Sequence, residues 1–87
     1  MSPFPKHELE DAWREKLRLA RERYEEAAKA FRASWEEHSE GRPTTDSTFA
    51  IQHARKLESH ALAEYMRVLK IFADLLLHGR VPEEPPK

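Results

Sequence analysis

Cysteine is absent from this chain, and glycine occurs only at Gly41 and Gly79. Without cysteine, neither a disulfide framework nor a thiolate metal site can form. Two isolated glycines also cannot build a phosphate-binding loop, which needs several of them close together. Proline is confined to the two ends and one joint, at Pro3, Pro5, Pro43, Pro82, Pro85 and Pro86. Two long stretches, about 6–40 and 45–78, therefore lack helix breakers.

An excess of charge of one sign is also missing. The formal net charge is −1 although 36% of the 87 residues are charged, which is unlike the basic excess of a nucleic-acid binder. No run approaches the roughly 20 apolar residues that a membrane-crossing helix needs. The first residues lack the basic region and apolar run of a secretory signal. We therefore expect a cytoplasmic protein that binds neither nucleic acid nor membranes.

The two uninterrupted stretches predict two long helices. Both are rich in Ala, Leu, Glu, Lys and Arg, which favour the helix. We expect one domain with helix one at about 6–40, a turn at about 41–45, helix two at about 46–78 and an extended tail at 80–87. Because the joint is short, the helices must run antiparallel, so the expected fold class is all-α, an antiparallel helical hairpin.

The joint and the second helix end contain residues that suit helix termini. Gly41 and Gly79 can both adopt the left-handed conformation that often ends a helix, and Pro43 prevents helix one from continuing. Three short oxygen-bearing side chains can cap the first amides of helix two, namely Thr45, Asp46 and Ser47. In the tail, Val81 can fold back on Trp13 as a small staple.

Helix one contains a single apolar stripe with steps of three and four residues. Its members are Leu9, Trp13, Leu17, Ala20, Tyr24, Ala27, Phe31 and Trp35. The stripe resembles a coiled-coil seam, and the other faces are charged, so one side of this helix is predicted to be buried. The aromatic residues at this spacing are interpreted as packing residues.

Helix two contains more apolar positions than one partner helix can cover. One stripe consists of Ala50, Ala54, Leu57, Ala61, Val68, Phe72 and Leu75. A second stripe lies beside it at Leu62, Tyr65, Leu69 and Leu76, and Met66, Ile71 and Leu77 widen the apolar arc. Two hairpins related by a two-fold axis would cover both stripes, so we predict a homodimeric four-helix bundle. The expected dimer interface is Leu62, Tyr65, Leu69, Phe72 and Leu76.

Histidines on helix two suggest a possible metal site. His53 and His60 are seven residues apart on one face, and Glu64 follows one turn later. Imidazole and carboxylate groups bind zinc and similar ions. However, Glu-x-x-His, the motif of di-iron bundles, is absent, and polar residues beside a core are the simpler interpretation. We predict no bound metal and no cofactor, with these three residues as the only candidate ligands.

One short segment suggests an alternative, catalytic function. The segment RKLESH, from Arg55 to His60, resembles the Arg-x4-His pattern of HEPN-type ribonucleases, which are also helical dimers. That resemblance implies an arginine that stabilises phosphate charge and a histidine that transfers protons. The main prediction remains a non-catalytic helical interaction or scaffolding protein that binds itself and can bind another protein. The alternative is a metal-dependent or HEPN-like enzyme that uses the Arg55 and His60 face.

Overall fold

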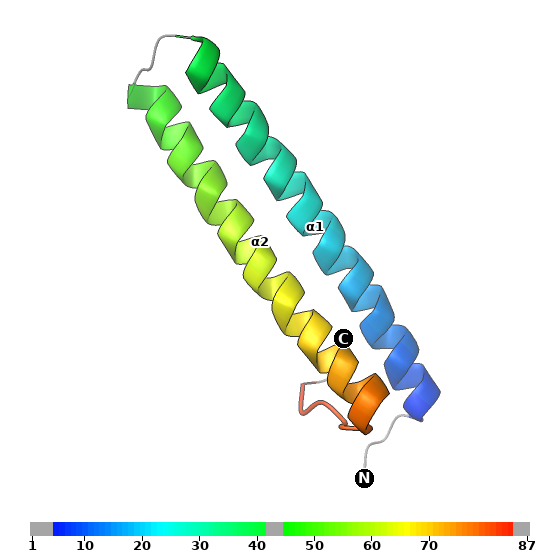
Figure 1. Ribbon diagram of the computed structural model, residues 1–87. Coiled ribbons are helices and arrows are strands. Elements are labelled where there is room, and N and C mark those ends of the chain that lie inside the picture. Colours follow the sequence, from blue (N-terminus) through cyan, green and yellow to red (C-terminus); the bar gives the residue numbers. More distant parts are fainter. Residues whose placement is uncertain (1–4, 42–44, 85–87) are drawn as a thin grey trace.

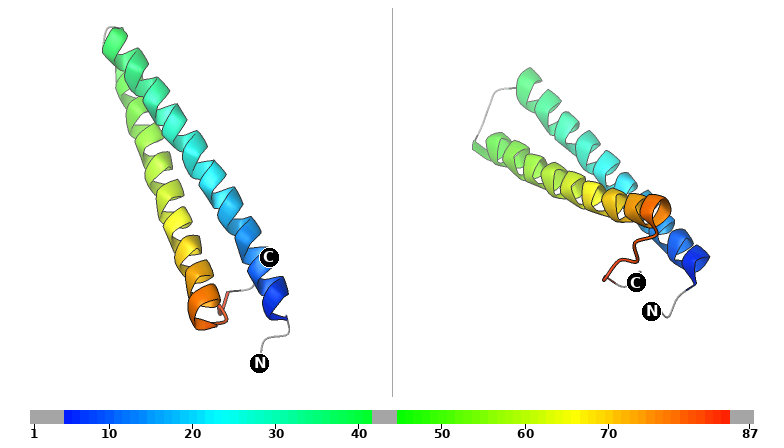
Figure 2. Two further views of the ribbon diagram at one scale, coloured as in Figure 1. Left: turned by 45° about the vertical axis from the view of Figure 1, so that its right-hand side comes forward. Right: turned by 60° about the horizontal axis from the view of Figure 1, so that its bottom comes forward.

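The expected helical hairpin is present in the computed structural model, which describes residues 5–41 and 45–84, without the side chains of 45–47. Helix α1 spans Lys6–Glu40 and helix α2 spans Thr45–His78, and the two pack side by side in opposite directions (Figure 1). The molecule measures 58 Å along its axis and only 19 Å and 16 Å across. The described chain ends, at the start of α1 and after the end of α2, lie in the half of the hairpin opposite the joint (Figures 1 and 2).

The two glycines end their helices differently. Gly79 has φ +65° and donates its N–H to the Leu75 carbonyl at 3.2 Å, which confirms the expected left-handed end. Gly41 has φ −96° and ψ −179°, so the same prediction is wrong for α1. Its N–H still bonds to the Glu37 carbonyl at 2.9 Å, and the chain leaves α1 by extending. The predicted caps of α2 lie outside the described side chains.

The buried core lies mainly in the half of the hairpin that holds the chain ends. Its members are Leu9, Trp13, Ala20, Val68 and Leu75, with Leu17, Tyr65, Ile71 and Phe72 packed against it. Trp13 is fully buried, but its indole N–H has no hydrogen-bond partner among the described residues. Toward the joint, the only buried hydrophobic side chain in the described part is Ala54. The half of the hairpin near the chain ends therefore has most of the packing.

Three positions expected in the seam are exposed, and the sequence spacing explains why. Trp35 is 53% exposed and Leu57 is 51% exposed, and Ala50 is also exposed. Beside the first two, the neighbouring residues Ser34 and Glu58 are half-buried in their place. A step of three residues and a step of four residues lead to adjacent positions, so the sequence alone allows either one to face the seam. At both places the register of the whole helix turns the less apolar residue, Ser34 or Glu58, toward the seam.

The segment after α2 folds back along the outside of the hairpin (Figures 1 and 2). The Arg80 N–H donates to the Asp74 carbonyl at 3.2 Å, and Glu84 forms an ion pair with Arg67 on α2. Val81 is 51% exposed, so it does not form the buried staple against Trp13 that we expected. Within the described residues, neither helix contains an apolar segment of the length needed to cross a membrane.

Candidate functional site: an apolar stripe on the outer face of α2

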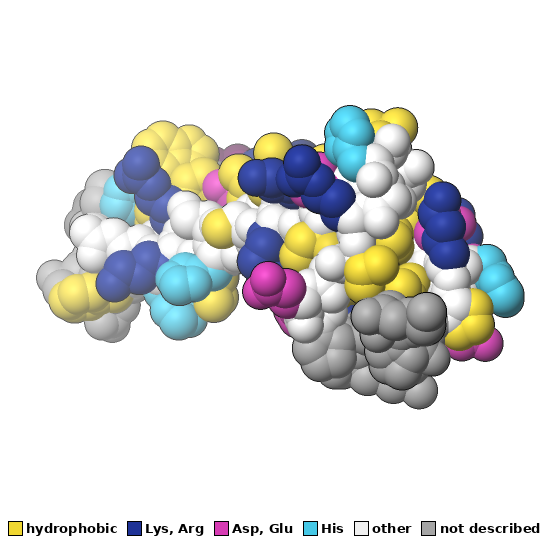
Figure 3. Space-filling model, turned by 90° about the horizontal axis from the view of Figure 1, so that it is seen from below, with side chains coloured by type: hydrophobic (Ala, Val, Ile, Leu, Met, Phe, Trp, Pro, Cys, Tyr) yellow, Lys and Arg dark blue, Asp and Glu magenta, His cyan; other side chains and the backbone are white. Residues whose placement is uncertain are grey.

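Four large apolar side chains remain exposed along one face of α2. With the half-buried Ala73 they form what we call the outer stripe: Leu62, Met66, Leu69, Ala73 and Leu76. Their spacing of four and three residues keeps them in line along the helix. Met66 is 55% exposed and Leu69 is 36% exposed. Large apolar side chains therefore reach the surface even though 36% of the residues in this chain are charged. From below, apolar side chains reach the surface between basic ones (Figure 3).

The five residues expected at a dimer interface fall into two groups. Leu62, Leu69 and Leu76 are exposed members of the outer stripe. Tyr65 and Phe72 are half-buried and pack against the core between the helices. The Tyr65 ring stacks on Tyr24 of α1, with 6.1 Å between ring centres and 22° between ring planes. These two aromatic residues therefore join the hairpin seam to the outer stripe.

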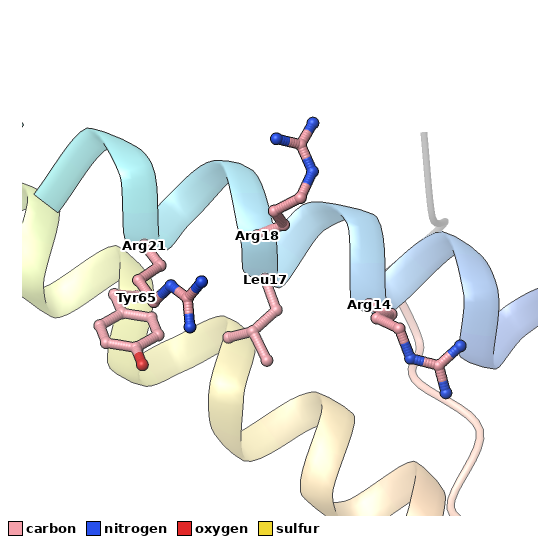
Figure 4. Close-up of a pocket in the computed structure, with 5 residues that line it drawn as sticks. All are labelled: Arg14, Leu17, Arg18, Arg21 and Tyr65. Atoms are coloured by element: carbon pink, nitrogen blue, oxygen red, sulfur yellow. The ribbon is translucent and has the colours of Figure 1, made fainter. Parts of the chain in front are cut away.

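Arginines of α1 border this face. Arg14, Arg18 and Arg21 line an open pocket of about 270 Å³, together with Leu17 and Tyr65. Figure 4 shows Leu17 and Tyr65 directed into the space between the helices, with Arg21 beside the tyrosine ring and Arg18 turned away. The face is thus apolar on α2 and basic on α1 in the half of the hairpin near the chain ends.

Each of these arginines is held by a carboxylate of its own helix. Arg14 bonds to Asp11 at 2.9 Å, and Arg21 lies 3.8 Å from Glu25. Two further carboxylates, Glu15 and Glu22, bond to Arg18. The hydrogen bonds from Arg18 hold the pKa of the Glu15 carboxyl below its usual range. Basic and acidic side chains therefore alternate along this side of α1.

Acidic and basic residues of α2 differ in how exposed they are. Its described carboxylates, Glu58, Glu64 and Asp74, are all half-buried. Its lysines and arginines are all exposed, and they are Arg55, Lys56, Arg67 and Lys70. Of these, only Arg67 has an ion pair within the described part of the chain. The exposed surface of α2 is therefore mainly apolar and basic, although the Glu64 side chain is as exposed as that of Arg67, at 44%.

The three candidate metal ligands do not converge. His53 and His60 are exposed and lie seven residues apart, which is about 10 Å along a helix and too far for one ion. Glu64 instead accepts two hydrogen bonds from Arg67, at 2.7 and 3.0 Å, which lower the pKa of its carboxyl. In residues 5–41 and 45–84, no group of three His, Cys, Asp or Glu side chains is placed to hold a metal.

The arginine and histidine of the RKLESH segment do share a surface feature. Arg55 and His60 line an open pocket of about 330 Å³, and the other lining residues are Gln52, Lys56 and Ser59. All five side chains come from α2, so the pocket is a hollow on one helix and not a cleft between helices. Arg55 and Ser59, seven and three residues before Leu62, continue the line of the outer stripe toward the joint, whereas His60 lies about 160° around the helix from Leu62.

Sequence reasoning missed Met66 as a full member of the exposed stripe and the alternation of charge beside it. The spacing Leu62, Met66, Leu69 was the available signal, because it follows steps of four and three. No protein-family model, curated protein or solved structure shows significant similarity to this chain.

Proposed function

We propose that this chain is a small helical interaction protein that self-associates as a homodimer through the outer stripe. The observation that carries the proposal is the line of exposed side chains Leu62, Met66, Leu69 and Leu76 on α2. Large contiguous apolar surfaces on a soluble protein usually mark an interface. The dimer would act by binding or scaffolding another protein, since its remaining surface is rich in charged groups.

The energetics of the hairpin also favour association. Its buried hydrophobic core within the described residues consists of six side chains, and two of those are alanines. Burial of apolar surface contributes about 25 cal/mol per Å², and small chains often need a partner to bury enough of it. A second copy would remove the stripe from water and would also cover the exposed parts of Tyr65 and Phe72.

Mass measurement tests the proposal directly. Sedimentation equilibrium at micromolar concentration should give twice the chain mass of 10.2 kDa. Leu69→Glu should shift the protein to the monomer, because it places a charge in the apolar contact. Leu57→Glu is the matched control, because Leu57 is also exposed but lies about 140° around the helix from Leu62. A monomeric wild type with cooperative unfolding would show that the stripe does not mediate self-association.

A second candidate function is favoured by one observation, the shared pocket of Arg55 and His60. In a shared hollow an arginine can stabilise phosphate charge while a histidine transfers a proton, as a ribonuclease requires. Incubation with a labelled single-stranded RNA tests this candidate. Cleavage that both Arg55→Ala and His60→Ala abolish would support it, and an intact RNA would exclude it for that substrate.

A further inference from the structure

We propose that two copies meet through α2 in antiparallel orientation, with the two-fold axis beside Leu69. This inference rests on the proposed homodimer, and it adds which helices touch and in what register. The two α2 helices would form the middle of the assembly, and the two α1 helices would lie outside them.

The apolar pattern of the outer stripe is self-complementary in this register. The stripe runs from Leu62 to Leu76, which is about 21 Å of helix, and Leu69 is its midpoint. When two such helices run antiparallel about Leu69, Leu62 lies opposite Leu76 of the second copy. Met66 then lies beside Ala73 of the second copy, so that a large side chain packs against a small one.

The basic residues of α2 select the same register. Because α2 ends at His78, an antiparallel pair centred on Leu69 overlaps only from about residue 60 to residue 78. Arg55 and Lys56 then lie beyond the end of the partner helix. A parallel pair in register would instead place Arg55 beside Arg55 of the second copy. Arg55 has no ion pair within the described residues, so the two arginines of a parallel pair would repel each other.

The arginines of α1 disfavour a different pairing, in which α2 packs on α1 of the second copy. With the two hairpins parallel, Leu62 and Leu69 would then face the row of Arg14, Arg18 and Arg21. That contact would cover leucines with guanidinium groups that already have carboxylate partners. When α2 instead packs on α2 of the second copy, the α1 helices lie outside and their arginines keep the carboxylate partners of their own helix.

The end of α2 of the second copy would lie near Arg55. In this register the C-terminal end of α2, which carries partial negative charge, would lie at the level of residue 60 of the first copy, on the side of the outer stripe. Arg55 lies on the line of the stripe, seven residues before Leu62, so it would be the basic residue next to this helix end. The dimer would contain two such junctions, about 40 Å apart by helix rise.

Cysteine substitution tests the register, because the natural chain has no cysteine. Leu69→Cys alone should form a disulfide-linked dimer under mild oxidation, since a residue on the axis meets its own copy. Leu62→Cys or Leu76→Cys alone should not, but an equal mixture of the two should link. A disulfide requires Cα atoms within about 7 Å, which makes it a strict measure of register. Ala63→Cys is the matched control, because Ala63 lies on the same helical turn as Leu62 but outside the outer stripe.

The outcomes separate this inference from the homodimer itself. Leu69→Cys and the mixture should give about tenfold more linked dimer than Ala63→Cys, because association raises the effective thiol concentration. Self-linking of Leu62→Cys would show a parallel dimer and would overturn the register alone. A wild type of dimeric mass with no linking at any stripe position would also overturn it. A monomeric wild type would overturn both proposals and would point to a different protein as the occupant of the stripe. Because the mixture does not alter Leu69, it tests the register even if Leu69→Cys misfolds.

Discussion

The guanidinium carbon of Arg14 on α1 lies 5.6 Å from the centre of the Phe72 ring on α2. Arg14 is held there by Asp11 at 2.9 Å, and Phe72 is half-buried against the core. The cation therefore covers part of an aromatic ring that stays only half-buried in the hairpin. Exposed contacts of this kind contribute about 0.5–1 kcal/mol. The pair closes one edge of the seam beside the outer stripe.

We expect Phe72→Ala to lower the free energy of unfolding by about 2–3 kcal/mol, which is below the usual cost for a fully buried phenylalanine. The reason is that the single hairpin covers only part of the ring. Urea unfolding at fixed chain concentration measures this cost, because association would add to it. A cost below about 1 kcal/mol would mean that the ring contributes little to the seam. Arg14→Ala should cost less than Phe72→Ala.

The buried indole of Trp13 gives a second prediction. Trp13→Ala should destabilise the hairpin by about 3–5 kcal/mol, because it removes the largest fully buried side chain of the core. Trp13→Phe should cost much less, since it keeps a ring and removes an N–H that has no partner in the described structure. Thermal unfolding followed by circular dichroism compares the two variants. Equal losses would contradict this expectation.

The hairpin could be predicted from sequence because helix breakers and apolar steps are both unambiguous over the two long stretches. The exact set of residues that face the other helix could not be predicted from the sequence. At Leu57 and Glu58, hydrophobicity alone selects the leucine, whereas the alternating steps of four and three through Ala61, Tyr65 and Val68, continued toward the joint, select the glutamate. Choosing the more apolar of two adjacent residues gives the wrong seam position here. A shift of one residue along a helix turns the side chain by about 100°, so only one of the two can face the other helix.

The candidate site was only partly predictable for a related reason. The excess of apolar positions on α2 was visible in the sequence, but which of them the single hairpin would cover depends on the crossing of two helices. Tyr65 lies over Tyr24 and is therefore part of the seam, while Leu62 remains exposed. The contact between Glu84 and Arg67 joins residues 17 positions apart, and no local pattern in the sequence indicates it.

The two helix ends provide a third prediction. Gly79→Ala should destabilise the protein by about 1 kcal/mol, because an alanine at φ +65° is strained even where space is open. Gly41→Ala should not suffer that strain, because φ −96° is accessible to any residue. Its Cβ would lie 3.1 Å from the Glu37 carbonyl oxygen, which requires only a small shift. A larger loss at Gly41 than at Gly79 in thermal unfolding would contradict this assignment.

The ion pair of Glu64 and Arg67 predicts a pH dependence. Hydrogen bonds from Arg67 lower the pKa of Glu64 in the folded state from its ordinary value of 4.5. The stabilisation is therefore complete above pH 4.5 and is lost as the pH falls through the lower, folded value. Both groups are partly exposed, so we expect less than about 1 kcal/mol. Glu64→Gln should lower the melting midpoint at pH 7 but not at a pH below the folded value, and a difference that persists there would exclude the ionic origin.

The last prediction concerns the segment that follows α2. Arg67 bonds to both Glu64 and Glu84, so one guanidinium links the segment to the helix. Glu84→Gln should weaken this link and speed amide hydrogen exchange at Arg80, whose N–H bonds to the Asp74 carbonyl. Glu83→Gln is the matched control, because Glu83 is exposed and has no ion pair within the described residues. Equal exchange at Arg80 in both variants would show that Gly79 and the helix end position the segment without Glu84. Faster exchange in Glu84→Gln alone would identify the carboxylate as its anchor.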